Sequence, residues 1–207
     1  LPILKLLPLL LLDSGLTLQD LLSAEDYTFV QAPLQEKLGP QAVFLERFKP
    51  IFISSLLTLD KISKDFSVTV DEHFYKQAQE QNKTIRGIET VEEQLKALDA
   101  MTLKEQAEVL VEQLRDTDKA DDMTDRMIDA YIAADLDDLM HLLVEAEMPG
   151  DAYESLLTNR NHTMADRIIL MTKDQPVFAA IGAGHLAGDE GVISLLRNKG
   201  YTVEPVR

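Results

Sequence analysis

The stretch Val177-Phe-Ala-Ala-Ile-Gly-Ala-Gly-His-Leu-Ala-Gly188 decides the fold that this sequence predicts. Residues 177–181 form an apolar run, which is typical of a buried strand. A glycine-rich turn follows, then a helix predicted over 189–198 and ended by Gly200, then a strand over 201–206. This closing strand, turn, helix and strand predict an α/β protein.

Two more strands are predicted upstream. Residues 66–70 are β-prone and run into Asp71, which can cap a helix over 72–81. Residues 84–89 have the pattern of a second strand, and Thr90 with Glu93 forms a capping box for the next helix. We therefore predict an α/β (mixed α+β) fold with a small mixed β-sheet.

Helical patterns occupy the remaining chain. Residues 17–59 alternate amphipathic segments with the breakers Gly39-Pro40 and Pro50, which predicts four short helices. Residues 102–172 carry helical periodicity without strand signals, and Thr102 with Glu105 makes a further capping box. We expect a single domain over 1–207, with residues 102–172 as a helical lobe inserted before the third strand.

The composition of the chain excludes some partners and some kinds of chemistry. A chain of 207 residues with 45% hydrophobic side chains can bury a core. Its 20 Lys and Arg against 36 Asp and Glu give a net charge of −16, which repels phosphate backbones, so nucleic acid is not an expected partner. The chain has no cysteine, which excludes disulfides and thiolate chemistry but leaves the compartment open.

The apolar opening, residues 1–12, is interrupted by Pro2, Lys5 and Pro8. It is shorter than the roughly 20 residues that a membrane-spanning helix needs, so no membrane span is expected. Leu1 is not an initiator methionine, and the segment lacks a signal-peptide pattern. We therefore expect the chain to start inside a longer protein.

The glycine-rich turn has two functional interpretations from its residues alone. Gly182, Gly184 and Ala187 match the dinucleotide pattern G-x-G-x-x-A, and Glu204 follows at the spacing of a ribose-binding acid. Against this stand the carboxylates of Asp189-Glu190, which would occupy the helix end that a pyrophosphate needs. The second interpretation makes His185 a ligand or catalyst at the carboxyl end of a strand.

A third interpretation needs no function at all. The glycines could supply positive φ in a tight turn that leaves His185 as a surface residue. One histidine by itself is never a metal site. The residues taken alone leave these three interpretations open.

Several motifs together resemble a known family. The stretch 180–203, with Gly182-Ala-Gly-His-Leu-Ala-Gly188 and Lys199-Gly-Tyr-Thr-Val203, resembles the closing signature of the TraB/GumN family. Residues 70–74 and 83–90 are similar to its central block, and residues 159–164 (Asn-Arg-Asn-His-Thr-Met) to its RN-containing helix. The resemblance runs in order from about residue 12 to the end. Known members include the Tiki proteins, which are metal-dependent peptidases, and bacterial proteins.

This resemblance implies an EreA/ChaN-like α/β fold and a set of site residues. The family's second G-x-x-H falls on Gly182 to His185, with Gly184 in the same substrate-side loop, and its central acid falls on Glu89. Arg160 and Asn161 occupy the RN positions. The family's first G-x-x-H has no counterpart in this chain, so we expect its N-terminal strand or strands to be lacking.

The implied chemistry is metal-dependent hydrolysis. His185 and Glu89 would bind a divalent metal (Mn, Co or Zn), which lowers the pKa of bound water to roughly 7. Glu89 could be ligand or general base, and Arg160 suits a substrate carboxylate or an oxyanion. Without the resemblance, Glu89 is a plain helix-start acid and Arg160 an exposed helix arginine. His162 adjoins the RN pair, where a surface role is favoured over a supporting one.

The function expected is therefore that of a metal-dependent peptidase, a hydrolase acting on a peptide or small-molecule substrate. Whether this truncated form keeps the activity is left open by the sequence. The alternative is a non-catalytic peptide- or ligand-binding module with the same fold. A sheet lacking its opening strand would expose an edge and allow copies to pair as a homo-oligomer. The family favours a bacterial source and an extracytoplasmic location, periplasmic or secreted.

Overall fold

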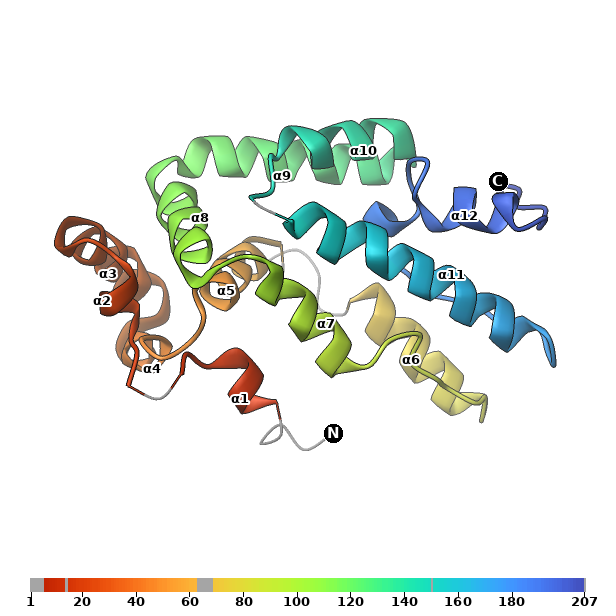
Figure 1. Ribbon diagram of the computed structural model, residues 1–207, viewed down its shortest axis with the longest axis horizontal. Coiled ribbons are helices and arrows are strands. Elements are labelled where there is room, and N and C mark those ends of the chain that lie inside the picture. Colours follow the sequence, from red (N-terminus) through yellow and green to blue (C-terminus); the bar gives the residue numbers. More distant parts are fainter. Residues whose placement is uncertain (1–5, 14, 63–68, 150, 207) are drawn as a thin grey trace. The chain divides into compact units, whose positions relative to one another are not determined.

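The computed structural model describes residues 6–13, 15–62, 69–149 and 151–206, and over these residues the fold is all-helical. Figure 1 shows helices and connecting loops but no strand arrow in the described chain. The predicted mixed α/β fold with a small β-sheet is therefore wrong for this part of the protein. The chain divides into two compact units, Leu1–Ser67 with Val91–Asp121 and Val68–Thr90 with Asp122–Arg207.

The missing strands have a physical reason. Residues 84–89, 177–181 and 201–206 are non-helical, but none of them exchanges a ladder of backbone hydrogen bonds with another described residue. A strand forms only when its backbone N–H and C=O groups bond to a neighbouring strand, and β-prone side chains alone do not provide these bonds. Residues 177–181 are also not buried as predicted: Phe178 is 72% exposed, with its ring 4.7 Å from that of Phe74 between centroids.

The strand predicted over 66–70 lies mostly outside the described residues. Its last residue, Val70, opens helix α6 (Val70–Glu80) instead. The cap of this helix is Thr69, whose Oγ1 accepts from the backbone N–H of Glu72 at 3.2 Å, and not Asp71 as predicted. The helix therefore begins two residues earlier than the sequence pattern indicated.

The first unit contains the four helices predicted over residues 17–59. Helix α3 ends at Leu38 because Gly39 takes a positive φ of 57°, and Pro50 opens α5. The predicted box of Thr102 and Glu105 caps α8. The α-helices of this unit are α1 (Leu7–Leu10), α2 (Leu18–Leu21), α3 (Ala24–Leu38), α4 (Ala42–Leu45), α5 (Pro50–Ile62), α7 (Val91–Ala97) and α8 (Leu103–Arg115).

The core of the first unit lies where α5 packs against α8, with α2, α3 and α4 around them. Leu18, Val30, Ile53 and Leu110 are fully buried there. Burying each such side chain contributes roughly 1.5–3 kcal/mol. The buried amide of Gln106 donates to the carbonyl of Met101 at 3.0 Å, which satisfies it inside this core.

The second unit contains α6, most of α9 (Thr117–Ile132), α10 (Leu136–Glu145), α11 (Asn159–Thr172) and α12 (Val192–Asn198). α11 packs against α12, and α10 packs against a 3-10 turn at Ala183–His185. The predicted helix over 189–198 begins at Val192 and is ended by Gly200, as expected. Gly200 has a φ of 90°, and the N–H of Tyr201 bonds back to the carbonyl of Leu196 at 3.1 Å.

No helix within the described part of the chain is long and apolar enough to cross a membrane. The prediction of a single domain over 1–207 with a helical lobe over 102–172 stays a prediction.

Candidate active site

Glu89 and Arg160 form a bidentate ion pair within the second unit. Arg160 Nε donates to Glu89 Oε1 at 2.9 Å, and Nη2 donates to Oε2 at 2.8 Å. The side chains are only 11% and 16% exposed. Arg160 Nη1 donates to the carbonyl of Leu156 at 2.9 Å, so the guanidinium is held on both sides. Both carboxylate oxygens of Glu89 are therefore engaged by one cation.

A π-helical turn, Glu154–Thr158, places Arg160 one residue into α11. In a π turn the backbone bonds shift to i→i+5, as in the bond from the N–H of Asn159 to the carbonyl of Glu154. Such turns occur frequently at functional sites. No sequence motif predicted this turn. It therefore supports a functional site here independently of the motifs.

Arg167 supports the same region from the next part of α11. It follows Arg160 by about two helical turns and so faces the same side. Its Nη1 donates to the carbonyl of Ile88 at 2.8 Å, next to Glu89. The backbone at Gly87 passes close to the Glu89 carbonyl oxygen, and a Cβ on Gly87 would lie 2.7 Å from it. The sequence motifs did not single out Arg167, although its spacing from Arg160 could have done so.

Asn161 links α11 to the glycine-rich loop. Its side chain is 3% exposed, and its Nδ2 donates to the backbone carbonyl of Glu190 at 2.8 Å. Its Oδ1 lies 2.7 Å from Nδ1 of His185. A buried amide with both ends bonded holds the imidazole against the helix that also carries Arg160.

The pKa of the half-buried His185 depends on its burial and on the charges of Arg160 and Glu89. Burial lowers the pKa of His185 below its usual value, the positive charge of Arg160 lowers it further, and Glu89 opposes both effects. His185 is therefore neutral at pH 7. The four residues Glu89, Arg160, Asn161 and His185, which the motifs had singled out, lie together in one cluster.

The two glycines of the motif have different surroundings. Gly182 has an ordinary φ of −58°, and a Cβ there would touch His185 Cδ2 at 3.7 Å. Gly184 packs against α10, where a Cβ would lie 3.1 Å from Leu143 Cδ1. Of the loop's glycines, Gly188 has the expected positive φ, at 78°, and Gly182 and Gly184 do not.

His162 lies at the surface, with its Nε2 2.7 Å from Oε2 of Glu190. The same Glu190 offers its backbone carbonyl to Asn161. His162 is therefore a surface residue whose hydrogen-bond partner, Glu190, also bonds to Asn161 of the cluster.

A divalent metal does not fit the described residues as they stand. They contain no group of three or more His, Cys, Asp or Glu side chains placed to hold an ion. Both oxygens of Glu89 already accept hydrogen bonds from Arg160. Because catalytic metal sites use three protein ligands, His185 and Glu89 alone do not complete one.

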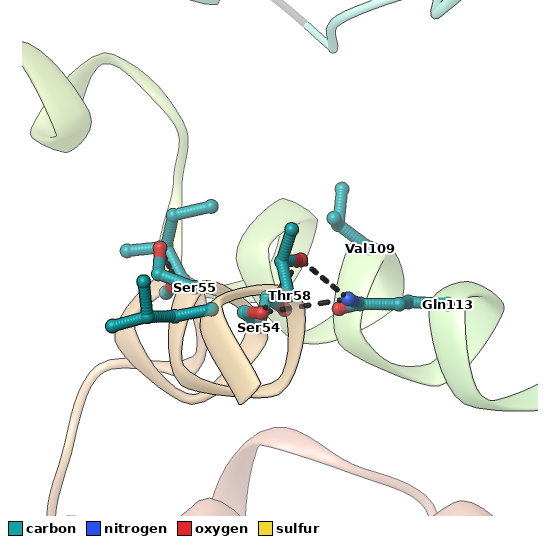
Figure 2. A pocket seen from close by; sticks show the side chains of 7 residues that line it. Ser54, Ser55, Thr58, Val109 and Gln113 are labelled. Atoms are coloured by element: carbon teal, nitrogen blue, oxygen red, sulfur yellow. Dashed lines mark hydrogen bonds between the residues drawn. The ribbon is translucent and has the colours of Figure 1, made fainter. Parts of the chain in front are cut away.

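A separate open pocket of about 510 Å³ lies in the first unit, between α5 and α8 (Figure 2). Figure 2 shows Gln113 donating to Thr58 Oγ1 and to the carbonyl of Ser54, at 3.0 and 3.4 Å. The lining residues are Ile51, Ser54, Ser55, Thr58, Leu59, Val109 and Gln113. None of them titrates near neutral pH or belongs to the predicted site, so this pocket offers no acid–base chemistry.

Comparison with known proteins settles the family. The profile of the TraB/PrgY/gumN family matches residues 3–205, nearly the whole chain. The chain belongs to the TraB/PrgY/gumN family. The resemblance to this family that the motifs indicated is thereby confirmed. The four residues of the cluster are those that the resemblance placed in the family's central block, its RN pair and its closing G-x-x-H.

Three curated relatives are similar to this family member. A "Metalloprotease TIKI homolog" from Nematostella vectensis is 27% identical over 76% of the chain and 39% of its own length. "Metalloprotease TIKI2" from Xenopus tropicalis is 28% identical over 77% and 36%, and "Metalloprotease TIKI1" from Danio rerio 26% identical over 94% and 50%. The chain thus spans half or less of these relatives. All three are animal proteins, so a bacterial source gains no support. No solved structure matches significantly.

Proposed function

We propose that this chain contributes the cluster of Glu89, Arg160, Asn161 and His185 to the active site of a peptidase. The observation that carries the proposal is their assembly: Glu89 and Arg160 are 71 residues apart, and Asn161 and His185 are 24 apart, yet they share one partly buried site. Residues that are distant in sequence, polar and buried together are typical of functional sites. The names of the three relatives support peptide hydrolysis as the reaction.

In this proposal His185 is the residue that meets the substrate. A neutral imidazole can accept the proton of a water molecule that attacks a scissile carbonyl. The Glu89–Arg160 pair holds α11 beside the segment that precedes Thr90 and sets the charge around the imidazole. All three nitrogens of Arg160 already donate to Glu89 or to the Leu156 carbonyl, so its proposed role is support rather than capture of a substrate carboxylate.

The relatives' names also support a metal requirement for the protein at its natural length. A bound divalent metal would lower the pKa of water and polarise the carbonyl. Because the described residues do not complete a metal site, further ligands would have to come from outside them. The preferred metal and the peptide or small-molecule substrate stay predictions, as do the homo-oligomer and the extracytoplasmic location.

The test is a peptidase assay on the protein at its natural length, with Mn²⁺, Co²⁺ or Zn²⁺ added. We expect His185→Ala to lower the rate 10²- to 10⁴-fold, about the contribution of a general acid or base. His141→Ala, which changes an exposed histidine on α10, is the matched control and should leave the rate unchanged. Equal rates for His185→Ala and the wild type would remove His185 from the reaction.

One observation favours a second function, a ligand-binding module without catalysis. Both oxygens of Glu89 already accept hydrogen bonds from Arg160, and this pairing competes with metal binding and with general-base catalysis by the carboxylate. If the binding module is correct, the protein will retain peptides at equilibrium without cleaving them. Two results together would favour this alternative: His185→Ala abolishes peptide binding, and the wild type forms no product in the presence of any of the three metals.

A further inference from the structure

The amide of Asn161 lies between a backbone carbonyl and an imidazole. Its two ends are 2.8 Å from the carbonyl oxygen of Glu190 and 2.7 Å from Nδ1 of His185. Amide oxygen and nitrogen have nearly the same shape, so the chemistry of the neighbours decides which end is which. A backbone carbonyl can only accept, and so Nδ2 of Asn161 must face Glu190.

The orientation of the amide determines the tautomer of the imidazole. With Nδ2 toward Glu190, the oxygen Oδ1 faces His185, and an amide oxygen can only accept. Nδ1 of His185 must therefore carry a proton. In a neutral imidazole only one nitrogen is protonated, so Nε2 keeps its lone pair. No described residue hydrogen-bonds to this Nε2, and it is available to a ligand or to a proton.

The carbonyl of Glu190 is itself held by the packing of the turn. Gly191 caps α12, and a Cβ there would lie 2.1 Å from the carbonyl oxygen of Ala187, which no side chain allows. The N–H of Gly191 bonds to the carbonyl of Gly188 at 3.1 Å, and the buried Val192 anchors the helix that follows. The acceptor that orients Asn161 is thus set by backbone and core rather than by a mobile side chain.

We propose that Asn161 is a positioning residue that holds His185 as the Nδ1–H tautomer, with the Nε2 lone pair free for the reaction. The Glu190 carbonyl, kept in place by Gly191, determines which way the amide points. This inference rests on the proposed function only for what Nε2 does, because the tautomer follows from the hydrogen bonds alone. Asn161 acts through His185 and need not touch the substrate.

The test is ¹⁵N NMR of the histidine rings in the 207-residue chain at a pH where His185 is neutral. The wild type should show a protonated Nδ1 and an unprotonated Nε2 for His185. Asn161→Leu removes the acceptor at similar size and should shift the tautomer ratio about fivefold toward Nε2–H, the effect of losing one hydrogen bond. Asn161→Asp keeps an acceptor and should retain Nδ1–H. Asn159→Leu, an exposed change on the same helix, is the matched control and should leave the ring signals unchanged.

A wild-type spectrum with the proton on Nε2 would overturn the proposal, and so would an Asn161→Leu spectrum identical to the wild type. If Asn161→Leu does not fold, the wild-type and Asn161→Asp spectra still decide it. The measurement needs no substrate and no activity. A chain with the expected tautomer but without peptidase activity at its natural length would therefore refute the proposed function and leave the role of Asn161 standing.

Discussion

Arg160 holds both carboxylate oxygens of Glu89, with contacts of 2.9 and 2.8 Å between side chains that are 71 residues apart. The pair ties α11 to the segment that precedes Thr90 within the second unit. The chain also contains an exposed Arg–Glu pair with two contacts, in which Nη1 and Nη2 of Arg126 both donate to Glu145 at 2.8 Å. Both pairs join one arginine to both oxygens of one glutamate, and they differ in burial, so the exposed pair can serve as a control.

Removing Arg160 should destabilise the fold strongly. Arg160→Met leaves the carboxylate of Glu89 in a nearly buried place without its cation, which costs about 3 kcal/mol. The double variant Arg160→Met with Glu89→Leu should lose less than the two single changes added together, because no lone charge remains. Urea unfolding measures these free energies. Arg126→Met is the control and should have little effect, since that pair is about 40% exposed; similar losses at both pairs would contradict the argument.

Stability should fall on acidification through His185. Its pKa in the folded state lies below the value of about 6.5 of a free histidine, because burial and Arg160 disfavour the charged ring. As the pH drops below about 6.5, the unfolded chain binds a proton before the folded chain does, and the free energy of unfolding decreases until the pH passes the folded pKa. His185→Gln should lose less stability between pH 7.5 and pH 5 than the wild type. Parallel pH profiles would show that the His185 pKa is not lowered.

Gly191 should tolerate no side chain, whereas Gly182 should. A Cβ on Gly191 would lie 2.1 Å from a backbone carbonyl oxygen, while a Cβ on Gly182 would make an ordinary contact of 3.7 Å. Gly191→Ala should therefore cost about 1–3 kcal/mol or more in the free energy of unfolding. Gly182→Ala should stay within about 0.5 kcal/mol. Thermal melts of both variants check this, and a wild-type melting temperature for Gly191→Ala would show that the turn can rearrange.

Ser54→Ala should leave the first unit unchanged or make it more stable. The Ser54 hydroxyl is buried beside the pocket of Figure 2 and has no hydrogen-bond partner among the described residues. Removing an unpaired buried hydroxyl relieves a desolvation cost of about 1 kcal/mol. Ser55→Ala, on the same helix but exposed and bonded to the carbonyl of Ile51, controls for helix propensity. A loss of stability in Ser54→Ala beyond that of Ser55→Ala would mean that the hydroxyl has a partner in solution.

The 207-residue chain should bind Mn²⁺, Co²⁺ and Zn²⁺ weakly. Two candidate ligands are available where three are usual, and Arg160 competes for one of them. Calorimetric titration should give no tight, stoichiometric binding, and Arg160→Met should raise the affinity by freeing the Glu89 carboxylate. Tight binding by the wild type would show that the chain completes a metal site after all.

Part of the candidate site could be predicted from the sequence, and part could not. Glu89, Arg160, Asn161 and His185 were found because they stand in ordered motifs that resemble a family. Arg167, Gly191 and the carbonyl of Glu190 were missed, although Arg167 and the carbonyl bond directly to the site or its neighbour. A backbone carbonyl has no residue type of its own, so its role is invisible until the chain has folded.

The sequence by itself determined the features that depend on neighbours along the chain. The end of α3 at Gly39, the box of Thr102 with Glu105 and the stop at Gly200 follow from local backbone preferences and short-range hydrogen bonds. Only the tertiary structure decided whether β-prone segments such as 177–181 pair, and how the amide of Asn161 points. Strand pairing and amide orientation depend on hydrogen-bond partners far away in the sequence, and folding alone determines which partners are within reach.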